Sequence, residues 1–172
     1  MFVARIDVTE ADVLLALLAR LRLQLSLDEN ACFETLDPLD LSVLPSGDFF
    51  VSVMQGGGTF EEGMQIGGGA SQLMEEARFV ITYYTRIKLD RGDRAEHILR
   101  HASRGIAAAK RAVLKAITAV DLTVASGAGA GSTFLRQLTT IVSASAPAFD
   151  KPLALAYAQL DLKLPFDWDL TD

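Results

Sequence analysis

The two histidines of this chain, His97 and His101, are its most suggestive candidates for metal chemistry. They lie four positions apart, a spacing that places two imidazoles on the same face of a helix, as in zinc-dependent proteases. In those enzymes a glutamate directly follows the first histidine and acts as general base, whereas Ile98 holds that position here. Arg100 and Arg104 also make the neighbourhood positive, which repels a cation. The pattern predicts no metal site, and the histidines are expected to be ordinary surface or interface residues.

Three other features could carry chemistry, and each has a simpler interpretation. Cys32 is the single cysteine, so no internal disulfide is possible, and no histidine lies near it in sequence to activate a thiolate. Asp167 and Asp169 lie on the solvent-exposed face of an expected strand, and an ordinary exposed charge is a simpler interpretation of this pair than acid–base catalysis. The glycines at 127–131 are followed by β-branched residues and Pro147 instead of a helix, unlike a dinucleotide-binding turn. The sequence therefore predicts no catalytic residue, no cofactor and no enzymatic activity.

Charge is distributed unevenly along the 172 residues, whose net charge is −6. Residues 86–115 carry nine basic and three acidic side chains, while the stretches before and after are acidic. An acidic chain with one basic stretch is not typical of a general nucleic-acid binder. The basic side chains would form either a solvated helix face or a docking surface for an acidic neighbour. The N-terminus predicts neither a signal peptide nor a membrane span, so a soluble protein made inside the cell is expected.

The elements that position these groups follow from the spacing of apolar residues. Helical spacing predicts helices over 9–25 and 93–120, and the first is apolar more widely than one sheet face can cover, which indicates burial on more than one side. Residues 26–47 show little periodicity and are expected to be an irregular connection that is functional or part of an interface. Strands are predicted from 49 to the glycines at 56–58, and over 73–89, 134–145 and 153–170. The pattern indicates a single α+β domain, with a mixed or antiparallel sheet flanked by helices in the order α-β-β-α-β-β.

The closing strand is the clearest of these elements because apolar and polar residues alternate without interruption from Leu160 to Leu170. Trp168 is expected on the buried face of this strand. Pro165 cannot donate a ladder hydrogen bond, which places at least that part of the strand at a sheet edge or a bulge. Another subunit could dock on such an edge.

A glycine-rich loop at 56–69 is the most unusual segment, because two glycine triplets enclose several apolar residues. Those apolar side chains must either fold back on the domain or find a partner. Two acidic residues in the loop could meet the basic stripe of an adjacent subunit. The candidate interface residues are Phe60, Glu61, Glu62, Met64 and Ile66 in the loop, with Arg94, Arg100, Arg104 and Arg111 on the basic helix.

The order of elements, together with the lone Trp168 in the sequence Phe166-Asp-Trp-Asp-Leu170, resembles the tail-terminator and tail-completion proteins of long-tailed bacteriophages. The resemblance covers most of the chain and implies one tail-terminator-like domain over 1–172. It implies a virion structural protein that caps the tail tube as a hexameric ring and joins tail to head. Its partners would be further copies of itself, the tail tube protein and head–tail connector proteins, with no membrane involved. It would be found in the virion, and in the host cytoplasm during assembly.

The acidic balance fits such a ring, because a negative channel lets DNA pass without specific binding. Alternatives stay open. A head–tail connector or neck subunit has a similar size and similar needs. A small module whose 93–120 helix binds nucleic acid belongs to a different class, and so does an enzyme whose site the sequence does not reveal.

Overall fold

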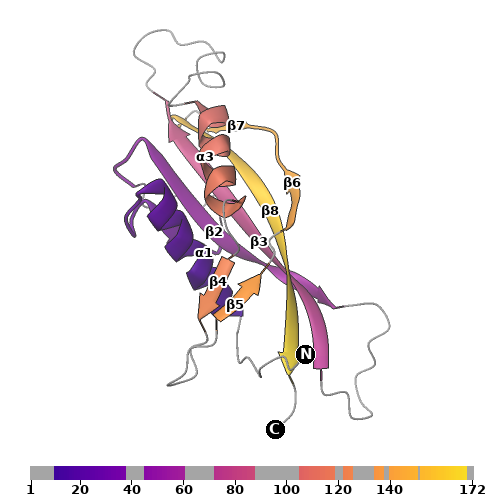
Figure 1. Cartoon of the computed structure of the whole chain (residues 1–172). Coiled ribbons are helices and arrows are strands. Elements are labelled where there is room, and N and C mark those ends of the chain that lie inside the picture. The colour runs from indigo at the N-terminus through magenta and orange to yellow at the C-terminus, as the bar shows by residue number, and fades with distance from the viewer. Residues whose placement is uncertain are drawn as a thin grey trace.

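Three long antiparallel strands form the centre of the sheet (Figure 1). They are β2 (Phe49–Phe60), β3 (Gln72–Arg86) and β8 (Leu155–Asp169). β1 (Cys32–Glu34) pairs in parallel with β2, whereas β6 (Thr140–Ala144) and β7 (Ala148–Asp150) pair antiparallel with β8. The sheet is therefore mixed and six-stranded, in the order β1-β2-β3-β8-β6 with β7 beside that path. The computed structural model describes residues 10–37, 45–60, 72–87, 105–118, 122–125, 134–137, 140–150 and 152–169.

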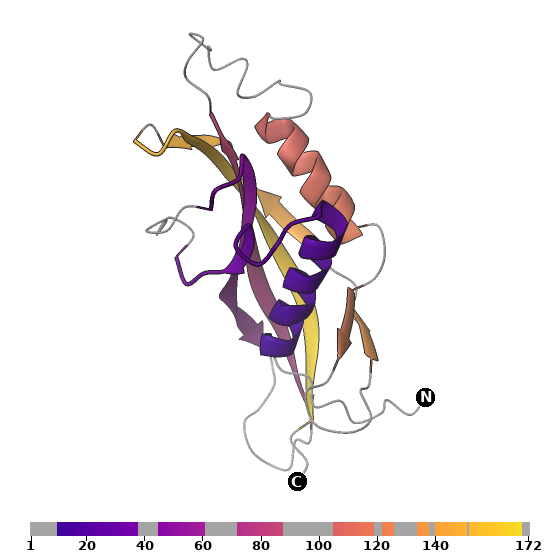
Figure 2. The same ribbon diagram turned by 90° about the vertical axis from the view of Figure 1, so that its left-hand side faces the viewer.

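Two helices cover one face of this sheet, as the view along its edge shows (Figure 2). They are α1 (Glu10–Leu25) and α3 (Ile106–Thr118). A separate antiparallel pair, β4 (Leu122–Ala125) and β5 (Phe134–Gln137), lies on the same side, and β4 contacts α1. Alternate residues of the long strands meet the helices, because successive side chains of a strand point to opposite faces. The fully buried centre of this layer includes Leu17, Leu21, Phe79, Ile81 and Val113.

A second, smaller apolar cluster lies on the face of the sheet turned away from the helices. Phe50 and Tyr84 stack there with ring centroids 4.6 Å apart, and Leu155 packs beside them. The guanidinium of Arg86 donates to the carbonyl oxygens of Pro45 and Gly47 at 2.7 and 3.3 Å. These bonds tie the residues before β2 to the end of β3.

The end of α1 sets the direction of the chain that follows. Ser26 takes a positive φ of 54°, and the amide of Leu27 donates to the carbonyl of Arg22 at 3.0 Å. This is the hydrogen bond of a Schellman cap, which reverses the chain after the last helical turn. Residues 28–37 consequently leave the helix layer and run along the β1 edge of the sheet.

The predicted α+β class, with a sheet flanked by helices, is confirmed, and the stated order of elements is roughly right. Within 26–47 the prediction missed β1, a three-residue strand parallel to β2. The strand from Phe49 does not stop at the first glycine triplet, as predicted, but continues to Phe60. A bulge between Gln55 and Gly58 allows this, with Gly57 at a φ of 76° that a side chain would disfavour.

Of the helix predicted over 93–120, the structure describes residues 105–118, of which Ile106–Thr118 form α3 while Gly105 is not helical. α3 begins at Ile106, and Gly105 directly before it accepts a hydrogen bond from the amide of Ala109 at 3.0 Å, as an N-cap residue does. Residues 88–104 and 119–121 lie outside the described residues.

The closing strand agrees with the prediction from its alternation. β8 pairs with β3 along its whole length, so that Pro165 stands opposite Glu76 and Trp168 opposite Leu73. Its pairing with β6 ends at Lys163, and among the described residues the stretch after Lys163 is paired on one side only. Pro165 therefore lies at a sheet edge in the described part of the chain. The buried position predicted for the Trp168 side chain stays a prediction.

Candidate assembly surfaces

The predicted interface residues are only partly within the described structure. Arg111 is exposed on α3, and Phe60 is the last residue of β2. The other candidates lie outside the described residues: Glu61, Glu62, Met64, Ile66, Arg94, Arg100 and Arg104. The histidines at 97 and 101 and the glycines at 127–131 also lie outside them.

The outer surface of α3 is basic. The helix carries three cations and no acidic residue; Arg111 and Lys115 are exposed, and Lys110 is half-buried. Its opposite side, which includes Val113 and Ile117, is buried against the sheet and α1. Arg111 therefore lies on the side of α3 away from its buried apolar residues.

The outer side of α1 is apolar, although it faces away from the core. Ala11, Leu15, Ala19 and Leu23 recur every four residues and are all exposed. Leu15 is 61% exposed and Leu23 is 76% exposed. The sequence predicted burial of this helix on more than one side, and in the single chain only the inner side is buried. The two helices are joined where the guanidinium of Arg20 donates to the carbonyl of Ala116 at 2.9 Å.

The segment over residues 28–37, called the acidic segment below, is held by its own hydrogen bonds. The Asp28 carboxylate accepts from the amides of Asn30 and Ala31 at 3.0 and 2.8 Å. The Thr35 hydroxyl accepts from the amide of Asp37 at 3.2 Å and donates to its carbonyl at 2.7 Å. These two turns are the side-chain-capped turns that Asp and Thr favour.

The acidic segment combines negative charge with one almost fully exposed apolar side chain. Leu36 lies between the two bonded ends of the second turn and is 93% exposed. Glu29 and Glu34 are also exposed. No Lys or Arg occurs between Arg22 and Arg78 in the sequence. Arg22 reaches the segment from α1, where its guanidinium donates to the carbonyl of Cys32 at 2.9 Å.

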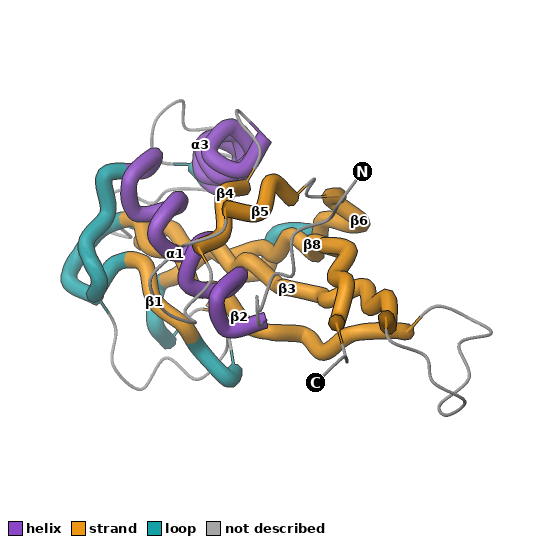
Figure 3. Tube along the Cα trace, turned by 60° about the horizontal axis from the view of Figure 1, so that its bottom comes forward, coloured by secondary structure: helices purple, strands orange, loops and turns teal. Residues whose placement is uncertain are grey.

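The opposite edge of the sheet differs in character. Figure 3 shows β1 at one edge and β6 at the other. β6 contains a bulge between Ile141 and Ser143, and Val142 at the bulge and Phe149 of β7 are exposed. No charged residue occurs between Arg136 and Asp150. Natural edge strands often carry charges that prevent pairing with other chains, and β6 carries none.

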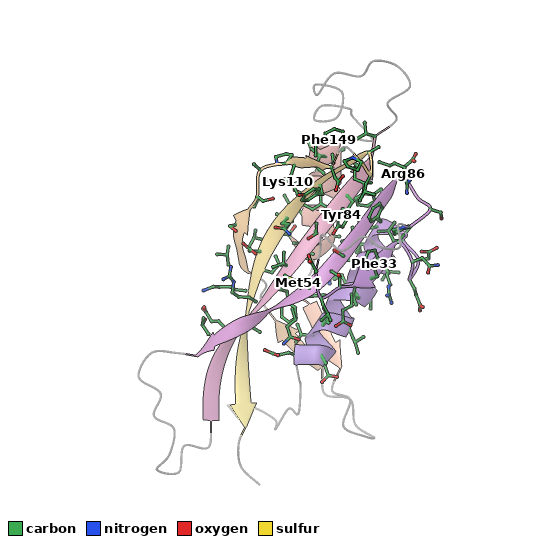
Figure 4. All side chains as sticks on the ribbon, turned by 180° about the vertical axis from the view of Figure 1, so that it is seen from behind. Phe33, Met54, Tyr84, Arg86, Lys110 and Phe149 are labelled. Carbon is green, nitrogen blue, oxygen red and sulfur yellow. The ribbon has the colours of Figure 1, made fainter. Side chains whose placement is uncertain are left out.

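Hydroxyl groups gather on the second face of the sheet, seen from behind in Figure 4. The Ser52 and Tyr84 hydroxyls are 3.1 Å apart, and the Gln159 amide donates to the Thr82 hydroxyl at 3.4 Å. Burial raises the pKa of Tyr84, and the hydrogen bonds of Ser52 and Thr82 partly oppose this rise. Tyr84 therefore stays protonated at neutral pH, and its hydroxyl holds neighbouring strands together.

Cys32 is unsuited to nucleophilic chemistry. Its side chain is fully buried, and its sulfur lies 4.0 Å from the carbonyl of Leu18. Burial raises the pKa of the thiol to about 11, although the charge and hydrogen bond of Arg22 act in the other direction. Since the thiolate is the reactive form, Cys32 is inert near neutral pH.

The described residues show neither a metal-binding cluster nor a membrane helix. No group of three or more His, Cys, Asp or Glu side chains in the described part of the chain is placed to hold a metal ion. Neither described helix is long and apolar enough to cross a bilayer.

No family model and no curated protein sequence matches this chain. Among solved structures it is similar to a chain from a structure titled "Virion of native gene transfer agent (GTA) particle". The two chains are 18% identical, the match covers 93% of this chain and 100% of the other, and the TM-score is 0.46. A likeness this distant does not by itself establish a shared function. The described surface of this α+β domain includes an apolar face on α1, a basic face on α3 and an acidic segment beside β2.

Proposed function

We propose that this protein is a virion structural subunit that assembles as a ring, caps the tail tube and joins the tail to the head. The main support for the proposal is that the described surface is divided into regions that differ in charge and polarity. The helix layer is apolar along α1 and basic along α3, the acidic segment follows the β1 edge, and the β6 edge is uncharged. Subunits of a closed ring meet head to tail through two different patches, so unlike surfaces are what a ring subunit requires.

The tail-terminator resemblance supplies the particular assembly: a hexamer, with the tail tube protein and head–tail connector proteins as neighbours. The net charge of −6 supports passage of DNA through the ring without specific binding, because a negative lumen gives no counterion release. The similar chain from a virion belongs to the same broad kind of assembly. A neck or connector subunit would use the same surfaces at a different level of the particle.

A small nucleic-acid-binding module is the second candidate, and α3 favours it. Its three cations without an acidic residue would be a contact surface for phosphates. The first candidate is preferred because the described residues beside this helix expose leucines, which contact protein better than they contact a phosphate backbone.

The two candidates are distinguished by the mass of the purified chain in solution and by its binding to DNA. We expect a species of about six times the 18.5 kDa chain to form as the concentration rises, and a ring to be visible by electron microscopy. Random duplex DNA near physiological salt is expected to bind weakly or not at all. A strict monomer that binds such DNA in the micromolar range, with a steep salt dependence, would contradict the proposal and support the nucleic-acid module.

A further inference from the structure

Leucine exposure is concentrated at two places in the described part of the chain. Leu15 and Leu23 stand on the outer side of α1, 61% and 76% exposed, with the small Ala19 between them. Leu36 stands on the acidic segment, 93% exposed. On α1 the exposed leucines join Ala11 and Ala19 in an apolar patch, and contiguous apolar patches mark surfaces for protein contact.

We propose that the acidic segment of one copy docks on the outer surface of α1 and α3 of the next copy, which rests on the proposed ring assembly and names its contact. Leu36 lies over Ala19, between Leu15 and Leu23 of the neighbour. The carboxylates of the acidic segment face the cations of α3. This contact uses Arg111, which the sequence also assigned to the predicted contact between the loop at 56–69 and the basic helix. Rescue by the charge reversals at Glu29 and Glu34 described below distinguishes the two contacts.

The opposite charges of α3 and the acidic segment favour a second copy of this chain as the partner that binds the helix surface. α3 offers Lys110, Arg111 and Lys115 without an acidic residue, and the acidic segment offers carboxylates in a stretch that contains no Lys or Arg. Opposite potentials on two protein surfaces favour their encounter and fix their register. Pairing α3 with α3 of another copy would bring like charges together, so the contact is head to tail and not between identical patches.

The geometry allows one copy to use both surfaces at once. In Figure 3 β1 and the described loops that flank it lie at one edge of the sheet, while α1 and α3 lie over one face. The acidic segment and the outer surface of the helices therefore belong to different parts of the described fold. A chain that donates its acidic segment to one neighbour still presents its helix layer to another, and such a head-to-tail contact forms a ring where the rotation between copies closes.

The backbone around Leu36 is already held in place before any contact forms. The hydrogen bonds between Thr35 and Asp37 fix the turn that presents it, and the amide of Thr35 donates to the carbonyl of Val53 in β2 at 3.0 Å. The segment is thus anchored to the sheet, and docking orders few additional residues. Because Leu36 makes little contact with its own domain, substituting it tests the interface without disturbing the fold.

A disulfide between two copies tests the contact directly. One chain carries Ala19→Cys and a second carries Leu36→Cys, and the two are mixed under mild oxidation. We expect a mixed dimer linked through these positions, identified by peptide mass spectrometry, because a disulfide requires Cα atoms within about 7 Å. The native Cys32 is buried and stays out of the reaction. Val142→Cys mixed with Leu36→Cys is the matched control on the opposite sheet edge.

Charge reversal tests the same contact without cross-linking. Arg111→Glu with Lys115→Glu is expected to raise the concentration at which half the chain is assembled by about tenfold or more, and Glu29→Lys with Glu34→Lys should do the same. The chain carrying all four changes should return to within about threefold of the original value, since opposite charges again face each other. Thermal unfolding of each variant serves as the folding control.

Other outcomes overturn the inference. The inference is wrong if the yield of mixed dimer from Ala19→Cys and Leu36→Cys is no higher than the yield from the Val142→Cys control. It is also wrong if the chain stays monomeric at millimolar concentration. If rings form and neither pair of charge reversals changes assembly, the contact proposed here is wrong and the ring function stands. If the cross-link and the charge rescue succeed but the assemblies are not rings, the contact stands and the ring function fails.

Discussion

Alkaline pH is expected to destabilise this fold through the thiol of Cys32. The side chain is fully buried, and burial raises its pKa from the ordinary value of 9.0 to about 11, against the opposing charge and hydrogen bond of Arg22. The folded state therefore holds the proton more tightly than the unfolded chain does. The protonated thiol stabilises the native state fully below pH 9.0, and this contribution is lost as the pH rises towards about 11.

The magnitude follows from the width of this pH window. Between the two pKa values the unfolded chain has released the proton and the folded chain has not, so the free energy of unfolding falls by about 1.4 kcal/mol per pH unit. Over the shift of the Cys32 pKa from 9.0 to about 11, the loss amounts to about 3 kcal/mol. Against a usual total of about 5–15 kcal/mol, such a loss is readily measured.

Urea unfolding at a series of pH values, from about pH 7.5 to pH 11, measures this loss when the original chain is compared with Cys32→Ala. Burial also raises the pKa values of Tyr83 and Tyr84, which adds a decline near the upper end of the range in both proteins. The difference between the two profiles isolates the thiol. Cys32→Ala should be less stable at neutral pH because it leaves a small cavity, and its profile should be flatter above pH 9. Parallel profiles would refute the assignment of the alkaline loss to Cys32.

Three further predictions concern the sheet and the glycine-rich loop. Tyr84→Phe and Ser52→Ala should each lower the free energy of unfolding by about 1–3 kcal/mol, since either change removes a partner from a buried hydroxyl. In urea unfolding the double variant should lose less than the sum of the two single losses, and strict additivity would exclude a coupled pair. Trp168→Ala should cost about 3–5 kcal/mol if the side chain lies in the core as its alternation predicts, and a near-native melting temperature would remove it from the core. Amide exchange over residues 56–69 should be slower in the assembled protein than in the monomer, and equal rates in both would argue against a partner contact there.

Elements with long and regular apolar patterns could be predicted from the sequence. The alternation from Leu160 onward located β8, and helical spacing located α1 within a residue. The prediction missed β1 because three residues are too few to show a period, and because parallel pairing with β2 depends on residues distant in sequence. It ended β2 too early because a glycine triplet resembles a break, whereas Gly57 allows a bulge that continues the strand.

The assembly surfaces were less accessible to sequence reasoning. The basic character of Arg111 and its neighbours could be predicted, because charge counting along a helix needs no tertiary information. The exposure of Leu36 could not, since it depends on a turn whose hydrogen bonds join Thr35 to Asp37. One signal for the α1 surface was present in the sequence, namely apolar residues on all sides of the helix. In the described structure the buried residues of α1 lie on one side and the other side exposes Leu15 and Leu23, so the excess apolar residues lie at the surface of the chain.

The energy of the proposed contact would allow a chain that is monomeric when dilute to assemble as a ring at higher concentration. Full burial of an exposed leucine contributes at most about 1.5–3 kcal/mol to the free energy of association. Leu15, Leu23 and Leu36 are between partly and almost fully exposed in the single chain, so their burial contributes up to that amount each. Bringing two proteins together costs about 4–15 kcal/mol in lost translation and rotation, so one such contact roughly balances its own cost. A pair is therefore weak, but a closed ring adds a further contact when the last copy joins two neighbours at once. Assembly should accordingly be steep in concentration, and open chains of two or three copies should be rare intermediates.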